Sequence, residues 1–464
     1  MGVERQKKQG QQELAFMAAE KSETRTVVRE GTETPIAEQG TESPTRSTAL
    51  MEAICERENL IKAWKQVKGN KGSPGIDGMR VEEAGGYLKE HWPAIREELL
   101  QGRYKPQPVK RVEIPKAGGG KRKLGIPTVV DRIIQQAVAQ VLEQEWDPTF
   151  SEHSYGFRPR RSAHQAVEQA QEYIREGYTI VVDMDLEKFF DRVNHDVMMG
   201  RVARRVGDKR VLKLIRGFLE SGVMEDGLAR ATEAGVPQGG PLSPLLSNLL
   251  LDELDKELER RGLRYCRYAD DANVYVKSER AGKRVMESLK KYLARKLKLQ
   301  VNEEKSGVGA AKERKFLGFT IIEEGGEPKR SISGRSLERF KERVREITGR
   351  SRGISLEDMV AELSKYVRGW RGYYGFCETP RVLRDLDKWI RHRLRCMVWK
   401  SWRRGRTRYK KLRQRGIGEK LAAMTAGSSH GPWRASRGDA MHKALPIAYF
   451  RRLGLAELAP RRLV

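Results

Sequence analysis

The sequence predicts a chain of the α+β class, in which a mixed body is followed by a mostly helical and strongly basic region. Short β-prone runs alternate with helical patterns over about residues 80–327, and helical patterns with Gly and Pro punctuation continue beyond them. Carboxylates follow apolar runs at two places in the body, 183–185 and 270–271. The 464 residues, 38% of them hydrophobic, suffice for two to four domains with cores of their own.

The net charge of +28 comes from 91 Lys and Arg against 63 Asp and Glu, and it predicts a polyanionic partner. Residues 329–464 hold 35 basic and 12 acidic residues, a net charge of +23, whereas residues 1–328 carry a net charge of only +5. Aromatic residues are interleaved with this charge, as in KWIRHRLRCMVWKSWRRGRTRYKK at 388–411, which a solvated tail does not require. We interpret the chain as a catalytic body followed by a nucleic-acid-binding region.

The N-terminal part gives three further expectations. Residues 1–48 are rich in Gln, Glu, Thr, Ser and Gly with little periodicity, which predicts a disordered extension. A helix is predicted from Ala49 to about Val67, and the Gly-rich stretch KGNKGSPGIDG predicts a loop after it. The sequence has no apolar run of membrane-spanning length, no signal-peptide pattern and four scattered cysteines, so we expect a protein of the bacterial cytoplasm, associated with the nucleoid or a ribonucleoprotein.

Two segments of the body carry the carboxylates. YTIVVDMDLEKFFDRVNHD (178–196) begins as a buried strand and presents Asp183 and Asp185 before it turns helical. YCRYADDANVYV (265–276) places Asp270 and Asp271 between two β-prone runs, the pattern of a tight hairpin. Carboxylates at strand ends and hairpin tips can converge on divalent cations. Two Mg²⁺ ions there, for which Mn²⁺ can substitute, would activate a 3′-hydroxyl and stabilise a leaving pyrophosphate.

At this point a family resemblance becomes visible. YADD at 268–271 resembles the signature of reverse transcriptases, and four flanking blocks occur in that family's order: RVEIPKAGGGKRKLGIPTVVDRIIQQAV (111–138), SYGFRPRRSAHQAV (154–167), AGVPQGGPLSPLLSNLLLDELDKEL (234–258) and KFLGF (315–319). From about residue 50 onward the sequence resembles a bacterial group II intron-encoded reverse transcriptase and maturase. The resemblance implies a right-hand polymerase with fingers and palm, followed by a helical thumb.

The resemblance also implies roles for individual residues. The metal-binding and catalytic set would be Asp185, Asp270 and Asp271, with the carbonyl of Leu186 as a further ligand. Nucleotide-contacting residues would be Lys116, Arg122, Phe189, Phe190 and Gln238. Residues near template or primer would be Arg158, Gly239, Tyr268, Phe316, Leu317 and Gly318. Lys116 and Arg122 flank a Gly-rich turn, so two cations lie on a flap that can fold over nucleotide phosphates.

Spacing favours Asp185 over Asp183 as the metal ligand. In right-hand polymerases an aromatic residue follows the catalytic Asp by five positions and lies beneath the nucleotide sugar. Asp185 is followed at that distance by Phe190, whereas Asp183 is followed by Lys188. We therefore predict Phe190 as the gate that rejects a ribose 2′-hydroxyl, with Phe189 as the alternative if the local turn differs, and we predict a structural role for Asp183.

The basic region resembles the maturase-specific region, domain X, which serves as the thumb. We predict four parts: a disordered extension (1–48), fingers and palm with an N-terminal helical extension (49–327), domain X (328–403) and a basic DNA-binding region (404–464). Endonuclease-containing relatives carry cysteine pairs for zinc at the C-terminus, and their lack here predicts the endonuclease-lacking subclass.

The predicted function is that of an RNA-directed DNA polymerase that binds its group II intron RNA, assists its splicing and copies it into DNA at a target site. Its partners would be intron RNA, an RNA template with a DNA primer, target DNA and dNTPs, without a membrane. Two alternatives stay open: a splicing-only maturase on an inactive polymerase scaffold, and a host-domesticated reverse transcriptase in defence or repair. The presence of all three metal-binding aspartates favours an active polymerase over the splicing-only maturase.

Overall fold

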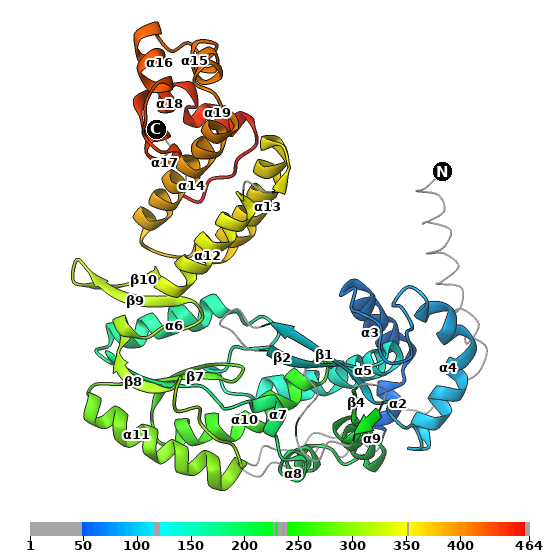
Figure 1. Cartoon of the computed structure of the whole chain (residues 1–464). Helices are drawn as coiled ribbons and strands as arrows, with labels where there is room; N and C mark the ends of the chain where they lie inside the picture. Colours follow the sequence, from blue (N-terminus) through cyan, green and yellow to red (C-terminus); the bar gives the residue numbers. More distant parts are fainter. Residues whose placement is uncertain are drawn as a thin grey trace, which may run out of the picture. The chain divides into compact units, whose positions relative to one another are not determined.

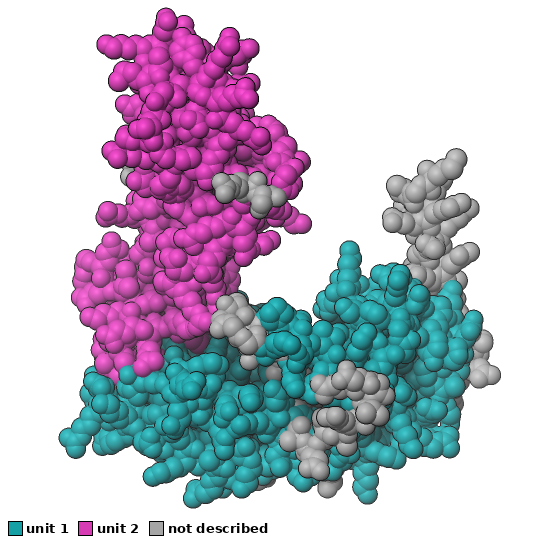
Figure 2. All heavy atoms as spheres, in the orientation of Figure 1, with its two compact units in different colours: residues 1–166, 182–308 teal, residues 167–181, 309–464 magenta. Residues whose placement is uncertain are grey.

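The computed structural model describes residues 49–115, 121–225, 228–230, 235, 239–349 and 352–459, so the predicted disordered extension 1–48 lies outside the described residues. The chain divides into two compact units (Figure 2). Unit 1 comprises Met1–Ala166 and Val182–Val308, and unit 2 comprises Val167–Val181 and Gly309–Val464. The predicted boundary between residues 327 and 328 therefore does not coincide with the boundary between the units.

The elements of the first part of the chain alternate as the sequence predicts (Figure 1). Its helices are α2 (Leu50–Ile54), α3 (Arg57–Gly69), α4 (Ala84–Leu100), α5 (Val129–Trp146), α6 (Ala163–Arg175), α7 (Phe189–Arg192), α8 (His195–Arg205), α9 (Lys209–Glu220), α10 (Ser243–Arg260) and α11 (Glu279–Tyr292), with short η1 (Asp147–Thr149) and η2 (Leu293–Leu297). Its strands are β1 (Val109–Pro115), β2 (Lys121–Ile126), β3 (Ile180–Met184), β4 (Val223–Glu225), β5 (Leu228–Arg230), β6 (Arg264–Tyr268), β7 (Asp271–Val276) and β8 (Gly307–Ala310).

These strands form two four-stranded sheets. The first has the order β2-β1-β4-β5, in which β1 and β2 form an antiparallel hairpin and β4 joins β1 in parallel. The second has the order β6-β7-β3-β8, so that a hairpin from late in the chain lies beside the strand that precedes Asp185. Strands β3 and β8 cross the division between the two units. This second sheet is the element that positions the candidate site.

One predicted helix is interrupted, and one is confirmed in detail. The helix predicted over 49–67 is two helices, because the chain at Glu56 is extended (φ −62°, ψ 138°) between α2 and α3. Helix α10 has the expected broad leucine face, with Leu245, Leu249 and Leu258 buried. It ends before Gly262, whose φ of +65° is the left-handed conformation that closes helices.

Unit 2 continues with η3, a two-stranded antiparallel sheet and eight helices among its described residues (Figure 1). They are η3 (Ala311–Glu313), β9 (Phe319–Glu324), β10 (Glu327–Ile332), α12 (Gly334–Ile347), α13 (Leu356–Tyr374), α14 (Pro380–Ser401), α15 (Gly405–Arg413), α16 (Glu419–Ala426), α17 (Pro432–Ala435), α18 (Asp439–Ala444) and α19 (Ile447–Arg452). Of the helices in the described residues, none is both long and apolar enough to cross a bilayer.

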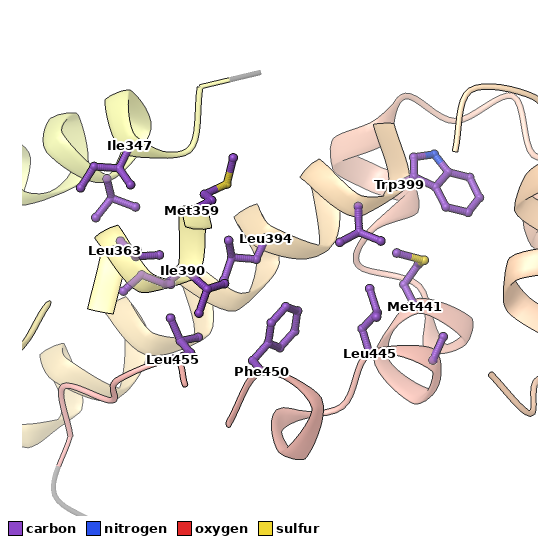
Figure 3. Close-up of a cluster of buried hydrophobic side chains, with 14 of the residues drawn as sticks. Ile347, Met359, Leu363, Ile390, Leu394, Trp399, Met441, Leu445, Phe450 and Leu455 are labelled. Carbon is purple, nitrogen blue, oxygen red and sulfur yellow. The ribbon is translucent and has the colours of Figure 1, made fainter. Parts of the chain in front are cut away.

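A single apolar cluster holds the helices of unit 2 together. It extends from Ile332 to Leu458, and Figure 3 shows Leu394 of α14 facing the same interior as Leu445 and Phe450 from the C-terminal helices. Trp399 is fully buried in this cluster. The predicted division between residues 403 and 404 consequently does not separate two cores, since both predicted parts contribute to one.

A polar cluster fixes part of α6 within unit 2. The Gln171 amide donates to the carbonyl of Pro328 at 2.6 Å and to the Glu378 carboxylate at 2.7 Å. Arg330 donates to Gln171 at 2.6 Å, and its guanidinium lies 4.0 Å from the centre of the Phe376 ring. Residues far apart in the sequence thereby close unit 2 around the β9–β10 hairpin.

We predict that one buried carboxyl makes unit 1 sensitive to pH. Asp131, 1% exposed, accepts hydrogen bonds from Thr128 Oγ1 at 2.8 Å and Tyr104 Oη at 3.0 Å. Burial raises its pKa from 3.8 to about 6, although these hydrogen bonds act in the opposite direction. The folded state thus binds the Asp131 proton more tightly than the unfolded state does. The stabilisation of the fold by this proton is complete below pH ~4 and is lost as pH rises through ~6.

The measurement is chemical denaturation of wild type, Asp131→Asn and the same-helix control Glu145→Gln at several pH values. Relative to Asp131→Asn, the free energy of unfolding of the wild type should fall between pH 4 and 7 by on the order of 3 kcal/mol, at 1.36 kcal/mol per pKa unit. The control should follow the wild-type profile. Parallel profiles for wild type and Asp131→Asn would show that burial does not perturb Asp131.

Candidate active site

Asp185 follows the last residue of β3 and is fixed by its backbone. Its carbonyl accepts from Asn302 N at 2.8 Å, and Glu187 N donates to Gln300 O at 2.8 Å, around an antiparallel bridge between Leu186 and Val301. In such a bridge the peptide groups of the central residue point away from the partner strand. The carbonyl of Leu186 is therefore directed away from residues 300–302, as a ligand role requires.

The carboxylate of Asp185 has a cationic neighbour that sequence analysis did not identify. Lys305 Nζ lies 3.3 Å from Oδ2 and 3.4 Å from Oδ1, while Asp185 N donates to Ser306 Oγ at 2.9 Å. The Lys305 side chain is 62% exposed, so it is free to move aside at small cost. The sequence signal for this contact is Lys305 itself, a basic residue in NEEKSG (302–307). This turn directly follows the residues that pair with the chain around Leu186.

The predicted hairpin carries the other two carboxylates. Tyr268 pairs with Asp271, and Ala269 and Asp270 form the two-residue turn between β6 and β7. Ala269 has a φ of +57°, a left-handed conformation that costs energy in a residue with a side chain. Asp270 is half-buried and Asp271 is exposed. The tight hairpin predicted from YADD is thus confirmed.

One side-chain contact brings the hairpin and β3 together. With its amide nitrogen facing β3, Asn273 donates to Asp183 Oδ1 at 3.2 Å and to the carbonyl of Ala272 at 3.3 Å. Asp183 is the penultimate residue of β3, and Asn273 is the third residue of β7. Asp185 and Asp271 each lie only two residues from this contact, so the predicted carboxylates share one end of the sheet. The contact is also consistent with the structural role predicted for Asp183.

The donor set at this sheet end fits a hard divalent cation. Carboxylate and carbonyl oxygens are the ligands that Mg²⁺ and related ions prefer. In the described part of the chain, no three acidic, histidine or cysteine side chains are already arranged as a metal site. Lys305 instead supplies a positive charge to Asp185. The structure therefore places the predicted ligands at one end of the sheet, without a preformed cage among the described residues.

A buried arginine holds the hairpin in place. Arg267 in β6 is fully buried and forms a salt bridge of 2.6 Å with Asp255 of α10. Its other donors reach Ser154 Oγ at 2.7 Å, Asn248 Oδ1 at 3.1 Å and the carbonyl of Ala269 at 2.9 Å. Burial alone would lower the pKa of Arg267, but the Asp255 carboxylate raises it. The bond from Arg267 to the carbonyl of Ala269 fixes the strained turn that carries Asp270.

The loop that contains YGF lies directly against the same turn. A Cβ placed on Gly156 would lie 2.2 Å from the backbone nitrogen of Ala269. The carbonyl of Gly156 accepts from Asn248 at 2.9 Å, and Tyr155 N donates to the carbonyl of Arg267 at 2.8 Å. Only glycine fits at this position.

The two predicted sugar-gate candidates differ in burial. Phe189 is 2% exposed, whereas Phe190 is half-buried, and their rings meet edge-to-face at 5.1 Å. The turn before them is set by Lys188, whose φ is +47°. Phe189 is therefore core, and Phe190 is the ring that a ligand can reach. This distribution favours the predicted five-residue spacing from Asp185.

Several predicted nucleotide-binding residues lie in or beside the parts that are not described. Lys116, Gln238 and the side chain of Arg122 are outside the described part of the chain, and the backbone of Arg122 pairs with Ile114. Gly239 is described and has a φ of +129°. A Cβ on Gly239 would lie 2.8 Å from the carbonyl of Gly125, so the glycine allows this loop to approach the β1–β2 hairpin.

Arg158 has a different environment from the one expected for a template-contacting residue. Its side chain is 5% exposed and forms a 2.6 Å salt bridge with Asp147. It also donates to the carbonyls of Ser151 and Ser154 and to the backbone carbonyl of Asp147. These bonds occupy Arg158 in holding the loop that precedes Gly156. The geometry favours a structural role, because the guanidinium faces protein carbonyls.

Phe157 is a candidate site residue that the sequence analysis did not single out. It is 50% exposed with a φ of +56°, and its ring centre lies 6.4 Å from that of Tyr268. Tyr268 itself is half-buried. An exposed aromatic beside the carboxylate turn suits contact with a base or sugar. The signal was present in YGFRP, where the aromatic follows the glycine that packs on the turn.

The predicted primer-grip residues form a tight turn within unit 2. Phe316 and Phe319 exchange backbone hydrogen bonds of 2.8 and 2.9 Å, with Leu317 (φ +51°) and Gly318 (φ +85°) between them. Tyr373 Oη donates to the carbonyl of Leu317 at 2.8 Å, and Ser333 N donates to that of Gly318 at 3.0 Å. Tyr373 of α13 and Ser333, the residue before α12, thereby hold this turn by its two carbonyls.

Comparisons with known proteins agree with these features. Family models match residues 114–321, "Reverse transcriptase (RNA-dependent DNA polymerase)", and residues 337–416, "Group II intron, maturase-specific domain". "Protein YkfC" of Escherichia coli (strain K12) is 34% identical over 61% of this chain and 85% of its own length. "Group II intron-encoded protein LtrA" of Lactococcus lactis subsp. cremoris is 31% identical over 61% of this chain, which spans 58% of LtrA. A solved "Partial Cas6-RT-Cas1--Cas2 complex" aligns with 53% of this chain and 42% of that chain at 24% identity, with a TM-score of only 0.35.

The contact at Gly156 predicts a local cost for a single methyl group. Gly156→Ala should destabilise unit 1 by roughly 1–3 kcal/mol, because backbone atoms of the carboxylate turn must shift. Gly200→Ala is the matched control, since a Cβ there, within α8, meets nothing within 4 Å. The control should be neutral or stabilising by up to about 1 kcal/mol. Chemical denaturation measures both, and equal stability of the two variants would contradict the close approach.

Proposed function

The chain belongs to the family of group II intron-encoded reverse transcriptases and maturases, and we propose that it polymerises DNA on an RNA template and assists the splicing of its intron RNA. The observation that carries the polymerase activity is the gathering of three aspartates at one end of the β6-β7-β3-β8 sheet. We further propose that the protein copies the spliced intron into DNA at a target site, using the cleaved target as primer. Intron RNA, target DNA, primer–template and dNTPs would be its partners.

The proposed metal ligands are Asp185, Asp270, Asp271 and the carbonyl of Leu186. Bound there, two Mg²⁺ ions would lower the pKa of the primer 3′-hydroxyl and stabilise the charge on the leaving pyrophosphate. The protein's part is to hold the carboxylates in place before the nucleotide arrives. The exposed side chain of Lys305 lies 3.3 Å from the Asp185 carboxylate and would move aside when a divalent cation binds there.

Nucleotide selection is proposed to rest on Phe190 and on the loops around it. A Cβ on Gly235 would lie 3.0 Å from the carbonyl of Phe190, so the glycine lets this loop pack against the backbone of the gate. The carbonyl of Gly235 in turn accepts from His195 Nε2 at 2.6 Å. A ring whose own backbone is packed in this way would reject a 2′-hydroxyl by steric contact. Lys116, Arg122 and Gln238 are proposed to contact the phosphates and base of the incoming dNTP.

Splicing assistance is proposed to depend on unit 2, which carries most of the excess positive charge. Its apolar cluster leaves most of the basic side chains of α12 to α19 exposed or half-buried, with Arg395 as a buried exception. Phosphate contacts of this kind bind structured RNA strongly and with a steep salt dependence. A splicing-only maturase would share this surface, so the two candidate functions differ in the polymerase chemistry alone.

The polymerase proposal predicts a separation of activities. Asp270→Asn or Asp185→Asn should abolish cDNA synthesis, by at least about 10³-fold, because one metal ligand loses its charge. RNA binding and splicing should remain close to wild type, since the basic unit 2 is unchanged. Primer extension on an RNA template and intron splicing assays on the same preparations measure both. Asp183→Asn is the matched control, and extension by Asp270→Asn at the wild-type rate would exclude the assigned ligands.

The two phenylalanines give a second, independent prediction. Phe190→Ala should raise the incorporation of ribonucleotides relative to dNTPs, because the ring that meets the 2′-hydroxyl is removed. Phe189→Ala should instead lower the free energy of unfolding by about 3–5 kcal/mol, as expected for a buried ring. Single-nucleotide incorporation with paired dNTP and NTP substrates, together with denaturation, separates the two effects. Loss of sugar selectivity in Phe189→Ala alone would assign the sugar gate to Phe189 and not to Phe190.

A further inference from the structure

One face of α14 presents a cluster of basic side chains to the C-terminal helices of unit 2. Arg391 precedes Arg395 by four positions, and His392 precedes it by three. Residues at these spacings are neighbours on a helix. His392 contacts α17, and Arg395 contacts the end of α18. This surface, which we call the α14 basic face, lies within the match to the maturase-specific domain, and that match assigns no role to its individual residues.

Arg395 is the unusual member of this face. It is 4% exposed, yet of the described residues no carboxylate lies within salt-bridge distance of it. Its Nε donates to the carbonyl of Leu445 at 3.0 Å, and its guanidinium carbon lies 5.7 Å from the centre of the Phe450 ring. A buried cation without a counter-ion is costly unless an anion from outside completes the site.

The groups around Arg395 are also basic. Burial lowers the pKa of Arg395 to about 10, and the neighbouring Arg391 acts in the same direction. His442 is exposed on α18, where burial of part of the ring and the charges of Arg395 and Arg391 lower its pKa, against the opposite effect of Asp439. Among the described residues, two acidic groups act on this cluster: Asp439 acts on His442, and Asp387 acts on Arg391. Asp387 already accepts from the backbone nitrogens of Leu458 and Ala459, and the basic groups outnumber these two carboxylates, so the electrostatic field here favours an anion.

An exposed indole lies beside these cations. Trp433 is 39% exposed, and its carbonyl accepts from His392 Nε2 at 2.9 Å. The rings of His392 and Trp433 are 3.7 Å apart, and the guanidinium of Arg437 lies 5.9 Å from the Trp433 ring. Trp399 and Trp402, in contrast, are buried in the apolar cluster. Trp433 is therefore a fixed aromatic surface that is open to solvent.

We propose that the α14 basic face, with Trp433 and His442, binds one nucleotide unit of single-stranded nucleic acid. Arg395 and Arg391 hold the phosphate, His442 borders it, and the unpaired base stacks on Trp433. His392 and Arg395 are three residues apart, about 4.5 Å along the helix, a separation that one nucleotide spans. Free phosphate would use the arginines but would leave the indole without a ligand. The inference rests on the proposed nucleic-acid function and adds a specific site to it.

The experiment measures the binding of labelled 12-nucleotide single strands to the full chain by fluorescence anisotropy, without dNTPs or divalent metal. Trp433→Leu should weaken binding at least about fivefold, since stacking on an aromatic ring contributes about 1–3 kcal/mol per base. An abasic strand of the same length should bind wild type and Trp433→Leu equally. Comparable loss with the abasic strand would show that the indole acts only through the fold, and would overturn the proposal.

The arginines are tested against a control on the same helix. Arg391→Gln should weaken binding about tenfold more than Arg384→Gln, which removes the same charge from an exposed position of α14. If Arg391→Gln lowers the melting temperature, the affinity of His442→Gln for the strand tests the site instead, because His442 is exposed and its replacement does not affect the core. The proposal is overturned if the strand binds with equal affinity to Arg391→Gln, His442→Gln and Arg384→Gln. In that case the cluster contributes only general surface charge.

The same titration with DNA and RNA strands of one sequence distinguishes the two sources of the nucleotide. The strand that binds with the higher affinity identifies whether the site takes DNA or RNA. Competition with inorganic phosphate at matched ionic strength should displace the strand only weakly. Full displacement would mean an anion site without base recognition. Primer extension by the wild-type chain, measured separately, tests the proposed function. An active polymerase whose Trp433→Leu variant binds both strands as the wild type does would refute this site and leave the polymerase assignment intact.

Discussion

The arrangement of the candidate site depends on a buried ion pair between Arg267 and Asp255. Both side chains are almost completely excluded from water, so either one alone would be an uncompensated buried charge. The pair is tolerable because Arg267 uses its remaining donors on Ser154, Asn248 and the carbonyl of Ala269. A neutral replacement could pack as well, but it could not hold a turn carbonyl, an amide and a hydroxyl from three segments at once. The position of the carboxylate turn follows from this network.

Local backbone strain at the site is compensated by the same network. Ala269, Phe157 and Lys188 all have positive φ, and each lies within a few residues of a proposed catalytic or substrate-contacting residue. Such conformations cost on the order of 1–3 kcal/mol each and persist only where the surroundings fix them. Here the bond from Arg267 and the close contact at Gly156 fix the turn. Carboxylates placed in advance need less reorganisation when cations and nucleotide arrive.

Unit 2 combines an apolar interior with a strongly basic exterior. The sequence signal for nucleic-acid binding was the interleaving of aromatics with Lys and Arg, but most of those aromatics serve the core. Trp399 and Trp402 are buried, and Trp370 packs on Phe340 at 4.4 Å between ring centres. The interleaving reflects the amphipathic pattern of helices that bury one face and charge the other. Trp433, which the sequence did not distinguish, is the tryptophan of the C-terminal helices that faces solvent.

The sequence by itself determined the mixed fold, the hairpin of Asp270 and Asp271 and the leucine face of α10, because these depend on local periodicity and spacing. Tertiary structure alone decided that Arg158 is bound by protein carbonyls, that Lys305 lies on Asp185, and that helix α6 shares unit 2 with the β9–β10 hairpin. Two of these contacts join residues far apart in the chain, 120 positions for Lys305 and Asp185 and 157 positions for Gln171 and Pro328. The carbonyls that bind Arg158 are 4 to 11 positions away, but the amphipathic pattern does not indicate them either. Periodicity describes only near neighbours, so it cannot specify which buried group will meet which partner.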